Sequence, residues 1–317
     1  MTQSVHHVTV VVPTRRRPAA LDRVLHGLAR QRDPGVPWDV VVVDNDTGPG
    51  TAATSSRAAL AALAVPVRVV VEPALGAANA RNRGITEAGG TIVAFIDDDV
   101  VPDDDWLQRL VEPLLNDRCE AVGGQVRLDA SGPRPRWLSS WLLPYLSHFH
   151  PSDQEVDLAS VPSDVLTEPY VLTANAAFTA EVLDRTGGFD PQLGTRDGVP
   201  FGNEELRLCR QVLAGGGRIR YLPTARVVHE LPPSRLRRSY FARRLYAQGR
   251  SDWMLDRDVL ATARSAGVRR AFELFGSDVR VAMSPERRTP VHRWLLSSAI
   301  QRAGFLREAV SCLVRRW

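Results

Sequence analysis

Residues 92–106 read IVAFIDDDVVPDDDW, an apolar run that stops abruptly at three aspartates. The consecutive apolar residues from Ile92 to Ile96 are typical of a buried β-strand. Three adjacent carboxylates at the end of such a strand repel one another unless a cation joins them. This stretch therefore predicts a buried sheet and a charged site at its edge.

The residues before this stretch repeat the same pattern and predict the fold. Apolar, β-branched runs predict strands at residues 8–13, 38–45, 67–72 and 91–97. Helical spacing or alanine-rich composition predicts helices at residues 18–30, 51–64 and 76–88. Alternating strands and helices favour an α/β fold, a Rossmann-like and mostly parallel sheet flanked by helices. Near-continuous valine indicates strands buried on both sides, and ligands of such sheets bind beyond the carboxyl ends of the strands.

The second half of the chain alternates less regularly. The pattern predicts a helix at 106–115, strands at 121–128 and 170–179, a helix at 203–213, and two short strands in RIRYLP and ARVVHE. Residues 130–168 predict a long functional flap with a short helix around 137–146. Arginine-rich helices are expected from Ser234 onward. We therefore predict a catalytic domain at residues 1–232 and a basic helical C-terminal region at residues 233–317.

The composition is that of a soluble globular protein. The 317 residues are 44% hydrophobic and 24% charged. No apolar run reaches the roughly 18–20 residues that span a bilayer, and the N-terminus lacks the pattern of a signal peptide, so we expect a cytoplasmic protein. Cys119, Cys209 and Cys312 lie far apart without zinc or disulfide spacing, which predicts buried structural thiols.

Charge is divided unevenly along the chain. From Arg235 onward, 18 arginines face 7 acidic residues, a net charge of +11, whereas the preceding residues carry −7. Residues 234–250, SRLRRSYFARRLYAQGR, resemble an amphipathic basic helix, and arginine suits phosphate recognition. We expect peripheral contact with the inner membrane face or a lipid-linked phosphate acceptor, with a solvated arginine-rich surface as the alternative. The acidic body disfavours nucleic acid.

The aspartates at 97–99 predict half of a metal site. Mg²⁺ and Mn²⁺ are often held by one or two carboxylates plus substrate phosphates, so a diphosphate would supply the other half. The alternative is a solvated acidic loop. For Asp103 to Asp105 we prefer that alternative, because acids there complement the start of the following helix.

Eight short motifs, in order along the chain, carry a resemblance to a known family. They are VVVPTRRRP, VVVVDND, LGAANARNRG, IVAFIDDDV, TANAAF, GGFDPQLG, GNEELRLCR and ARVVHE. Over roughly residues 8 to 250 the chain resembles the family 2 glycosyltransferases, an inverting class with the GT-A fold. The resemblance implies a nucleoside-diphosphate sugar (UDP-, GDP- or dTDP-linked) as donor and a divalent cation, Mg²⁺ or Mn²⁺, as cofactor.

The resemblance also implies which residues bind the donor. Those that would line or contact the nucleotide base and ribose are Pro13, Thr14, Arg15, Asp44 and Asp46. Arg81 would reach the phosphates or ribose, although Arg83 is as plausible on spacing alone. Relatives often carry Asn where this chain has Arg16.

The same resemblance assigns the metal site. Asp97 and Asp98 would face the ribose and sugar, Asp97 would also be a metal ligand, and Asp99 would be the main metal ligand. His229 matches a position that completes the metal site or contacts the diphosphate in some relatives. A packed or capping histidine is an equally weighted alternative.

The chemistry needs a base. Inversion is an in-line displacement in which the acceptor hydroxyl loses its proton, so a carboxylate within hydrogen-bond reach helps. Glu205 is our choice, in the first turn of a predicted helix whose dipole favours the ionised form and which Asn203 would cap. Relatives often have Glu-Asp here, so Glu204 stays open as the base.

Two other functions fit parts of the pattern. A sugar-nucleotide nucleotidyltransferase can share the architecture, but it would need a glycine-rich phosphate loop directly after the first strand. Residues 14–17 there read TRRR. A non-catalytic nucleotide-binding protein would not need both the aspartates at 97–99 and the glutamates at 204–205. A dehydrogenase is disfavoured, because no G-x-G-x-x-G follows the first strand. The base, the sugar and the acceptor stay open.

Overall fold

The computed structural model of the chain describes residues 6–46, 48, 55–129, 134–196, 198–260, 298–308 and 311. The chain forms two compact units. The first comprises residues 1–191 and 204–231, and the second comprises residues 192–203 and 232–317. The predicted domain boundary at residue 232 stays a prediction, and the two units are described separately below.

The first unit alternates strands and helices. Its elements, in chain order, are β1 (Val8–Thr14), α1 (Pro18–Ala29), β2 (Trp38–Asp44), α3 (Arg57–Ala61), β3 (Val67–Val71), α4 (Ala77–Glu87), β4 (Ile92–Ile96), β5 (Val100–Pro102), α5 (Trp106–Leu115), β6 (Ala121–Leu128), η1 (Ser140–Leu146), β7 (Val156–Asp157), η2 (Leu158–Ser160), β8 (Asn175–Thr179), α6 (Ala180–Thr186), α7 (Glu204–Ala214) and β9 (Ile219–His229). Of the predicted helix at 51–64, the first four residues lie outside the described part of the chain.

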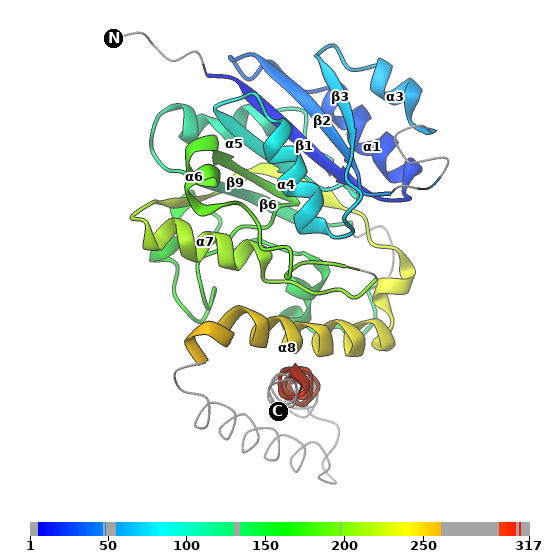
Figure 1. The fold of residues 1–317 in the computed structure, drawn as a ribbon, viewed down its shortest axis with the longest axis vertical. Helices are drawn as coiled ribbons and strands as arrows, with labels where there is room; N and C mark the ends of the chain where they lie inside the picture. Colours follow the sequence, from blue (N-terminus) through cyan, green and yellow to red (C-terminus); the bar gives the residue numbers. More distant parts are fainter. Residues whose placement is uncertain are drawn as a thin grey trace. The chain divides into compact units, whose positions relative to one another are not determined.

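One sheet joins all of these strands in the order β3-β2-β1-β4-β8-β6-β9-β5, with β7 also pairing β9 (Figure 1). The pairs β1–β2, β1–β4, β2–β3 and β6–β9 are parallel, and β8 is antiparallel to both of its neighbours. The strands β1 to β4, β6 and β9 therefore run in one direction and end at one edge of the sheet. This confirms the predicted mostly parallel α/β fold.

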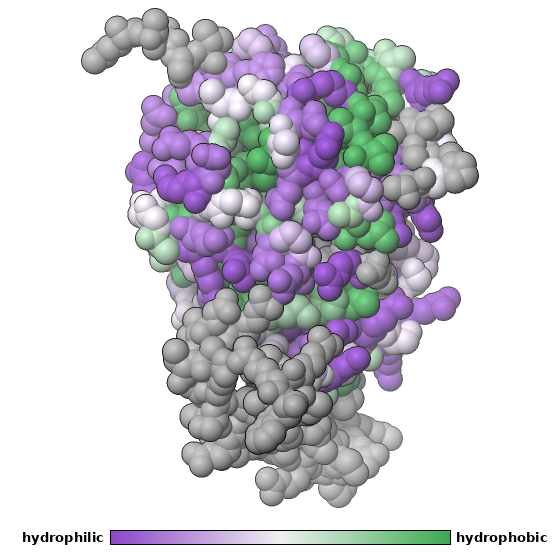
Figure 2. Space-filling view, in the orientation of Figure 1, coloured by the Kyte–Doolittle hydropathy of each residue, from purple (hydrophilic) through white to green (hydrophobic). Residues whose placement is uncertain are grey.

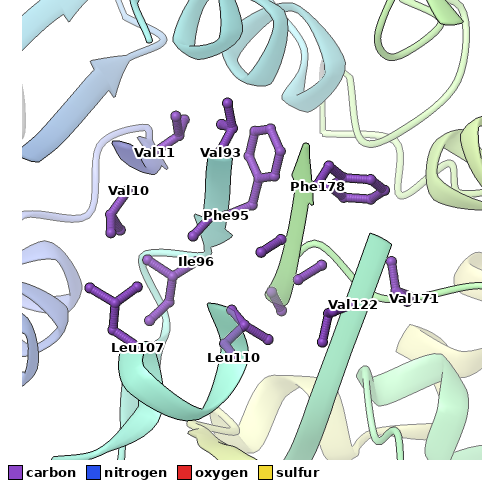
Figure 3. Packing of buried hydrophobic residues seen from close by; sticks show 14 of the residues in the cluster. Val10, Val11, Val93, Phe95, Ile96, Leu107, Leu110, Val122, Val171 and Phe178 are labelled. Carbon is purple, nitrogen blue, oxygen red and sulfur yellow. The ribbon is translucent and has the colours of Figure 1, made fainter. Parts of the chain in front are cut away.

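The central strands are buried on both faces, as predicted. Figure 3 shows Val93 and Phe95 on one side of β4 and Ile96 on the other, beside Leu107 of α5. The helix α4 covers the opposite face of the sheet from α5. It lies close to β1, because a Cβ added at Gly84 would come 2.2 Å from Val11 Cγ1.

The prediction of burial on both sides was wrong for β3. This strand lies at the sheet edge, and Val69 and Val71 are 45% and 47% exposed. Hydrophobic residues gather on the surface in Figure 2 where β3 and α3 lie in Figure 1. An edge strand has a neighbour on one side only, so its valines signal β-propensity without full burial.

Three predicted elements differ from the structure. RIRYLP and ARVVHE form one continuous strand, β9, whose register against β6 shifts between Gly124 and Gln125. The strand predicted from residue 170 begins only at Asn175, and the flap helix is a 3₁₀ helix, η1. Pro223 interrupts the strand pattern but sits at the irregular part of the pairing, where its missing N–H is tolerated.

The second unit combines a loop at 192–203 with helices. It contains η3 (Pro233–Leu236), α8 (Arg238–Leu260) and a helical stretch at 298–308. The last two approach closely, since a Cβ added at Gly249 would come 1.6 Å from the Gln301 carbonyl oxygen. The rings of Trp253 and Phe305 pack edge to face at 5.2 Å.

The loop at 192–203 is bound to α8. Asn203 donates to Asp252 Oδ1 at 2.9 Å and accepts from Gln248 Nε2 at 2.7 Å, and its predicted role as the cap of α7 stays a prediction. Cys119 and Cys209 are buried free thiols, as predicted, and Cys312 lies outside the described residues. Within the described residues, no helix has the length and apolar character needed to cross a bilayer.

Candidate active site

The aspartates after β4 lie at the edge where the parallel strands end. Asp98 is 5% exposed; its Oδ2 accepts a 2.8 Å hydrogen bond from Thr14 Oγ1, and its Oδ1 lies 3.1 Å from Arg17 Nη1. Burial raises the pKa of Asp98 to about 6, although the charge of Arg17 opposes that shift. The neighbouring ends of β1 and β4 thus hold this carboxylate in a fixed orientation.

Asp99 lies between an arginine and a histidine. Its Oδ2 is 2.9 Å from Arg17 Nη1, and its Oδ1 is 3.4 Å from Nε2 of the buried His229. Antiparallel pairing of β5 with β9 sets Val100 opposite His229, and the Glu230 amide donates to the Asp99 carbonyl at 3.0 Å. The short strand β5, which the sequence did not reveal, therefore joins residues 130 positions apart.

Arg81 connects the aspartates that follow β4 with the glutamates at the start of α7. Its guanidinium is 3.0 Å from Asp97 Oδ1 and 3.1 Å from Glu204 Oε1, and it lies over the ring of Phe189. Burial alone would lower the pKa of Arg81, but the nearby charges, first those of Asp97 and Glu205, outweigh it and raise that pKa. Arg83, the alternative on spacing, pairs with Glu87 instead.

The acidic pair at the start of α7 has two different environments. Glu204 is buried, and its Oε2 has no hydrogen-bond partner among the described residues. Burial and the charge of Glu205 raise the pKa of Glu204 to about 8, against the effect of Arg81. Glu205 is half-buried, and its Oε1 accepts a 2.8 Å hydrogen bond from Thr173 Oγ1. Glu205 is therefore the better placed of the two to meet a substrate.

The end of β2 provides the predicted base-binding residues. Asp44 is fully buried at the end of the strand, beside Thr14 of β1. Asn45 holds the loop before α4, donating to the Glu72 and Ala74 carbonyls and accepting from the Gly76 amide, each at 2.8 Å.

Arg16 and Asp46 form a pair beside this strand end. Arg16, with a positive φ of 55°, donates to Asp46 at 2.6 Å, and that hydrogen bond holds the pKa of Asp46 below its ordinary value. Pro13 and Arg15 flank Thr14 and are half-buried. The residues predicted to line the nucleotide therefore gather at one edge, and their roles stay predictions.

The site fits a divalent cation with two protein ligands. His229 Nδ1 lies 2.9 Å from the Leu146 carbonyl oxygen, which can only accept, so in the neutral ring the lone pair is on Nε2, facing Asp99. In that tautomer Asp99 Oδ1 and His229 Nε2 could both contact one cation. Among the described residues no three His, Cys, Asp or Glu side chains form a metal cluster. Water and substrate phosphates would complete the coordination of Mg²⁺ or Mn²⁺.

Two residues of the site were missed in the sequence. Arg17 bridges Asp98 and Asp99, and Thr173 holds Glu205. An arginine run after one strand and an aspartate run after its neighbour could have suggested the first contact. Thr173 precedes β8 without a distinctive pattern, and only the folded chain brings it to α7.

The family model of Glycosyl transferase family 2 matches residues 9–165, which include Asp99 and all of the predicted donor-binding residues. This part of the chain belongs to glycosyl transferase family 2. The matched region is therefore a glycosyltransferase domain, as the four motifs within it predict. Glu204, Glu205 and His229 lie beyond the matched residues.

Two relatives are similar to the chain over more residues than the family model matches. The pre-mycofactocin glycosyltransferase of Mycobacterium tuberculosis is 26% identical over 227 residues, which cover 70% of this chain and 42% of that protein. The succinoglycan biosynthesis protein ExoM of Rhizobium meliloti is 27% identical over 274 residues, covering 84% of this chain and 79% of ExoM. The chain thus spans less than half the length of the mycobacterial relative.

Solved structures of glycosyltransferases confirm the predicted GT-A fold. The mannosyltransferase PcManGT of Pyrobaculum calidifontis, in complex with GDP-Man and Mn²⁺, has a TM-score of 0.59 at 20% identity, covering 95% of this chain and 86% of that one. S. aureus TarS 1-349 in complex with UDP has a TM-score of 0.52 at 15% identity, covering 96% and 91%.

Proposed function

We propose that this family 2 protein is an inverting, metal-dependent glycosyltransferase that moves a sugar from a nucleoside diphosphate to an acceptor hydroxyl. The observation that carries the proposal is the meeting of Asp98, Asp99 and His229 with Arg81 and the acidic pair at one edge of the sheet. PcManGT and TarS, which share the fold, are described with GDP-Man and UDP respectively.

Glu205 acts as the base in this proposal. The acceptor oxygen forms a bond to the anomeric carbon, the bond from that carbon to the phosphate oxygen breaks, and the hydroxyl proton passes to the Glu205 carboxylate. The hydrogen bond from Thr173 orients that carboxylate. Glu204, buried and with a raised pKa, serves instead to fix Arg81.

Asp99 and His229 would hold the divalent cation, with Asp97 and Asp98 on the donor side. When bound, the cation supplies positive charge that stabilises the departing diphosphate. Arg81 orients Asp97 through its 3.0 Å contact. Asp44 and Asp46 face the nucleotide base. Whether Arg81 itself also contacts phosphate stays a prediction.

A thermal-shift panel of UDP, GDP and dTDP, each with and without Mn²⁺, tests the proposal. One nucleotide should raise the melting temperature, more so with Mn²⁺, since a ligand that binds only the folded state stabilises it. Asp99→Asn should remove the metal-dependent part. Asp104→Asn, an exposed aspartate paired with Arg30, is the matched control and should behave as wild type. If no nucleotide shifts the wild type, a donor-binding function is excluded.

The arginine-rich segment after Glu230 is part of the proposal. Arg237, Arg238 and Arg243 are exposed, and no acidic residue occurs between Glu230 and Asp252. We propose that this segment contacts anionic phosphate groups at a membrane surface, where a lipid-linked acceptor would be held.

A further inference from the structure

Arg17 occupies a central position in the acidic site. Its single nitrogen Nη1 lies 3.1 Å from Asp98 Oδ1 and 2.9 Å from Asp99 Oδ2. One positively charged atom between two carboxylate oxygens gives the stabilisation that a bound cation would otherwise give. Arg17 therefore neutralises Asp99, the proposed cation ligand, together with the adjacent Asp98.

Arg17 differs from the other bridging arginine in its exposure. The Arg81 side chain is 6% exposed and lies over the ring of Phe189, whereas the Arg17 side chain is 48% exposed. The Arg17 carbonyl accepts hydrogen bonds from the Ala20 and Leu21 amides at the start of α1. The backbone is thus anchored while the guanidinium can turn into solvent without opening the core.

The two aspartates keep other contacts when Arg17 turns away. Asp98 Oδ2 still accepts from Thr14, and Asp99 Oδ1 still faces His229. The carboxylates would therefore stay in position without the positive charge of Arg17. A divalent cation would then meet less electrostatic repulsion at Asp99.

We propose that Arg17 is a resident counter-ion that competes with the divalent cation for Asp99, so that the cation binds tightly only together with a nucleoside diphosphate. The inference rests on the proposed function. Diphosphate oxygens attract both the cation and the guanidinium, which couples metal binding to nucleotide binding.

Mn²⁺ titration followed by electron paramagnetic resonance tests this on the full chain, alone and with UDP, GDP or dTDP. Arg17→Gln removes the charge and keeps a hydrogen-bonding side chain. It should tighten the binding of Mn²⁺ alone by about tenfold or more, and it should reduce the factor by which the nucleotide tightens Mn²⁺ binding. Arg17→Ala repeats the measurement with no polar group, and Arg17→Lys should resemble wild type.

The control is Arg30→Gln, which breaks the exposed pair with Asp104 and should leave Mn²⁺ binding unchanged. Melting curves establish that each variant is folded. Equal or weaker Mn²⁺ binding in both folded, charge-removing variants overturns the inference, and nucleotide-dependent Mn²⁺ binding by wild type would show that the proposed function survives. If the wild type binds no Mn²⁺ with any of the three nucleotides, the inference about Arg17 and the proposed function are both wrong.

Discussion

At the scale of single residues, the hydroxyl of Thr173 distinguishes Glu205 from Glu204. It is fully buried and donates to Glu205 Oε1 at 2.8 Å. A hydrogen bond to a carboxylate stabilises its charged form, by about 1.5–3 kcal/mol in typical cases. Arg81 and Glu204 also lie near Glu205. Replacing Thr173 leaves both of these side chains in the protein, so it changes the hydrogen bond alone.

Thr173→Val, which has nearly the same shape, should therefore leave the Glu205 carboxylate without this hydrogen bond and less well oriented. With a sugar donor of the nucleotide that the thermal-shift panel identifies, kcat should fall about tenfold while KM for the donor changes little. Thr173→Ser keeps the hydroxyl and should restore kcat. An unchanged kcat in the valine variant would mean that Thr173 does not orient the base.

Glu204 should make stability depend on pH. Its pKa is about 8 in the folded protein and has an ordinary value of 4.5. The folded state therefore holds a proton that the unfolded state releases, and this contribution is lost as pH rises towards 8. Glu204→Gln mimics the protonated form. Relative to wild type, it should gain roughly 1 kcal/mol of unfolding free energy per pH unit between pH 5 and pH 8.

Urea unfolding of both proteins at pH 5 and pH 8 measures this difference. The control is Glu181→Gln, on the exposed first turn of α6, which should show the same difference from wild type at both pH values. A Glu204→Gln difference that does not change with pH would exclude a proton on Glu204 in the folded state.

At the scale of secondary-structure elements, the packing of α4 on β1 positions Arg81. Gly84 is one turn along α4 from Arg81, and a Cβ there would lie 2.2 Å from Val11 Cγ1. Gly84→Ala should therefore push the helix away and destabilise the fold by about 1–3 kcal/mol. Gly89→Ala, where nothing lies within 4 Å, is the matched control in denaturant unfolding. Equal stability of the two variants would show that the helix adapts freely.

The elements near the N-terminus could be predicted because local pattern and tertiary environment agree there. β1, β2 and β4 read as buried valine- and isoleucine-rich runs, and they are buried. β5 has only three residues, too few for any period, and it exists through its pairing with β9. Asn175, in the TANAAF motif, holds the irregular β6–β9 pairing by donating to the Gln125 and Ala225 carbonyls, which no spacing rule indicates.

The candidate site could likewise be predicted only in part from the sequence. The strand-end residues such as Thr14, Asp44 and Asp98 could be predicted, because parallel strands bring their carboxyl ends to one edge. Side-chain pairings could not, since Arg15, Arg16 and Arg17 are adjacent and equivalent in the sequence. In the folded chain, the turn before α1 places Arg17 beside Asp99 and Arg16 beside Asp46.

At the scale of the whole molecule, the charge asymmetry predicts how the chain meets a membrane. The residues from Arg235 onward carry a net charge of +11, and the preceding residues carry −7. Part of the apolar surface of α8 is already used, because Gly249 and Trp253 pack on the helical stretch at 298–308. Membrane contact through this segment should therefore be electrostatic and sensitive to salt.

Flotation of the full chain with liposomes measures this contact. The protein should float with phosphatidylglycerol vesicles at low salt, and it should not float with phosphatidylcholine vesicles or in 0.5 M salt, where the Debye length is about 4 Å. Changing Arg237, Arg238 and Arg243 to Gln should weaken binding about 100-fold, at about 1 kcal/mol for each charge. Changing Arg30, Arg57 and Arg83 to Gln alters the net charge equally and should have little effect. Equal loss in both triple variants would mean that overall charge governs binding, and no flotation of the wild type would leave the arginine-rich segment as a solvated surface.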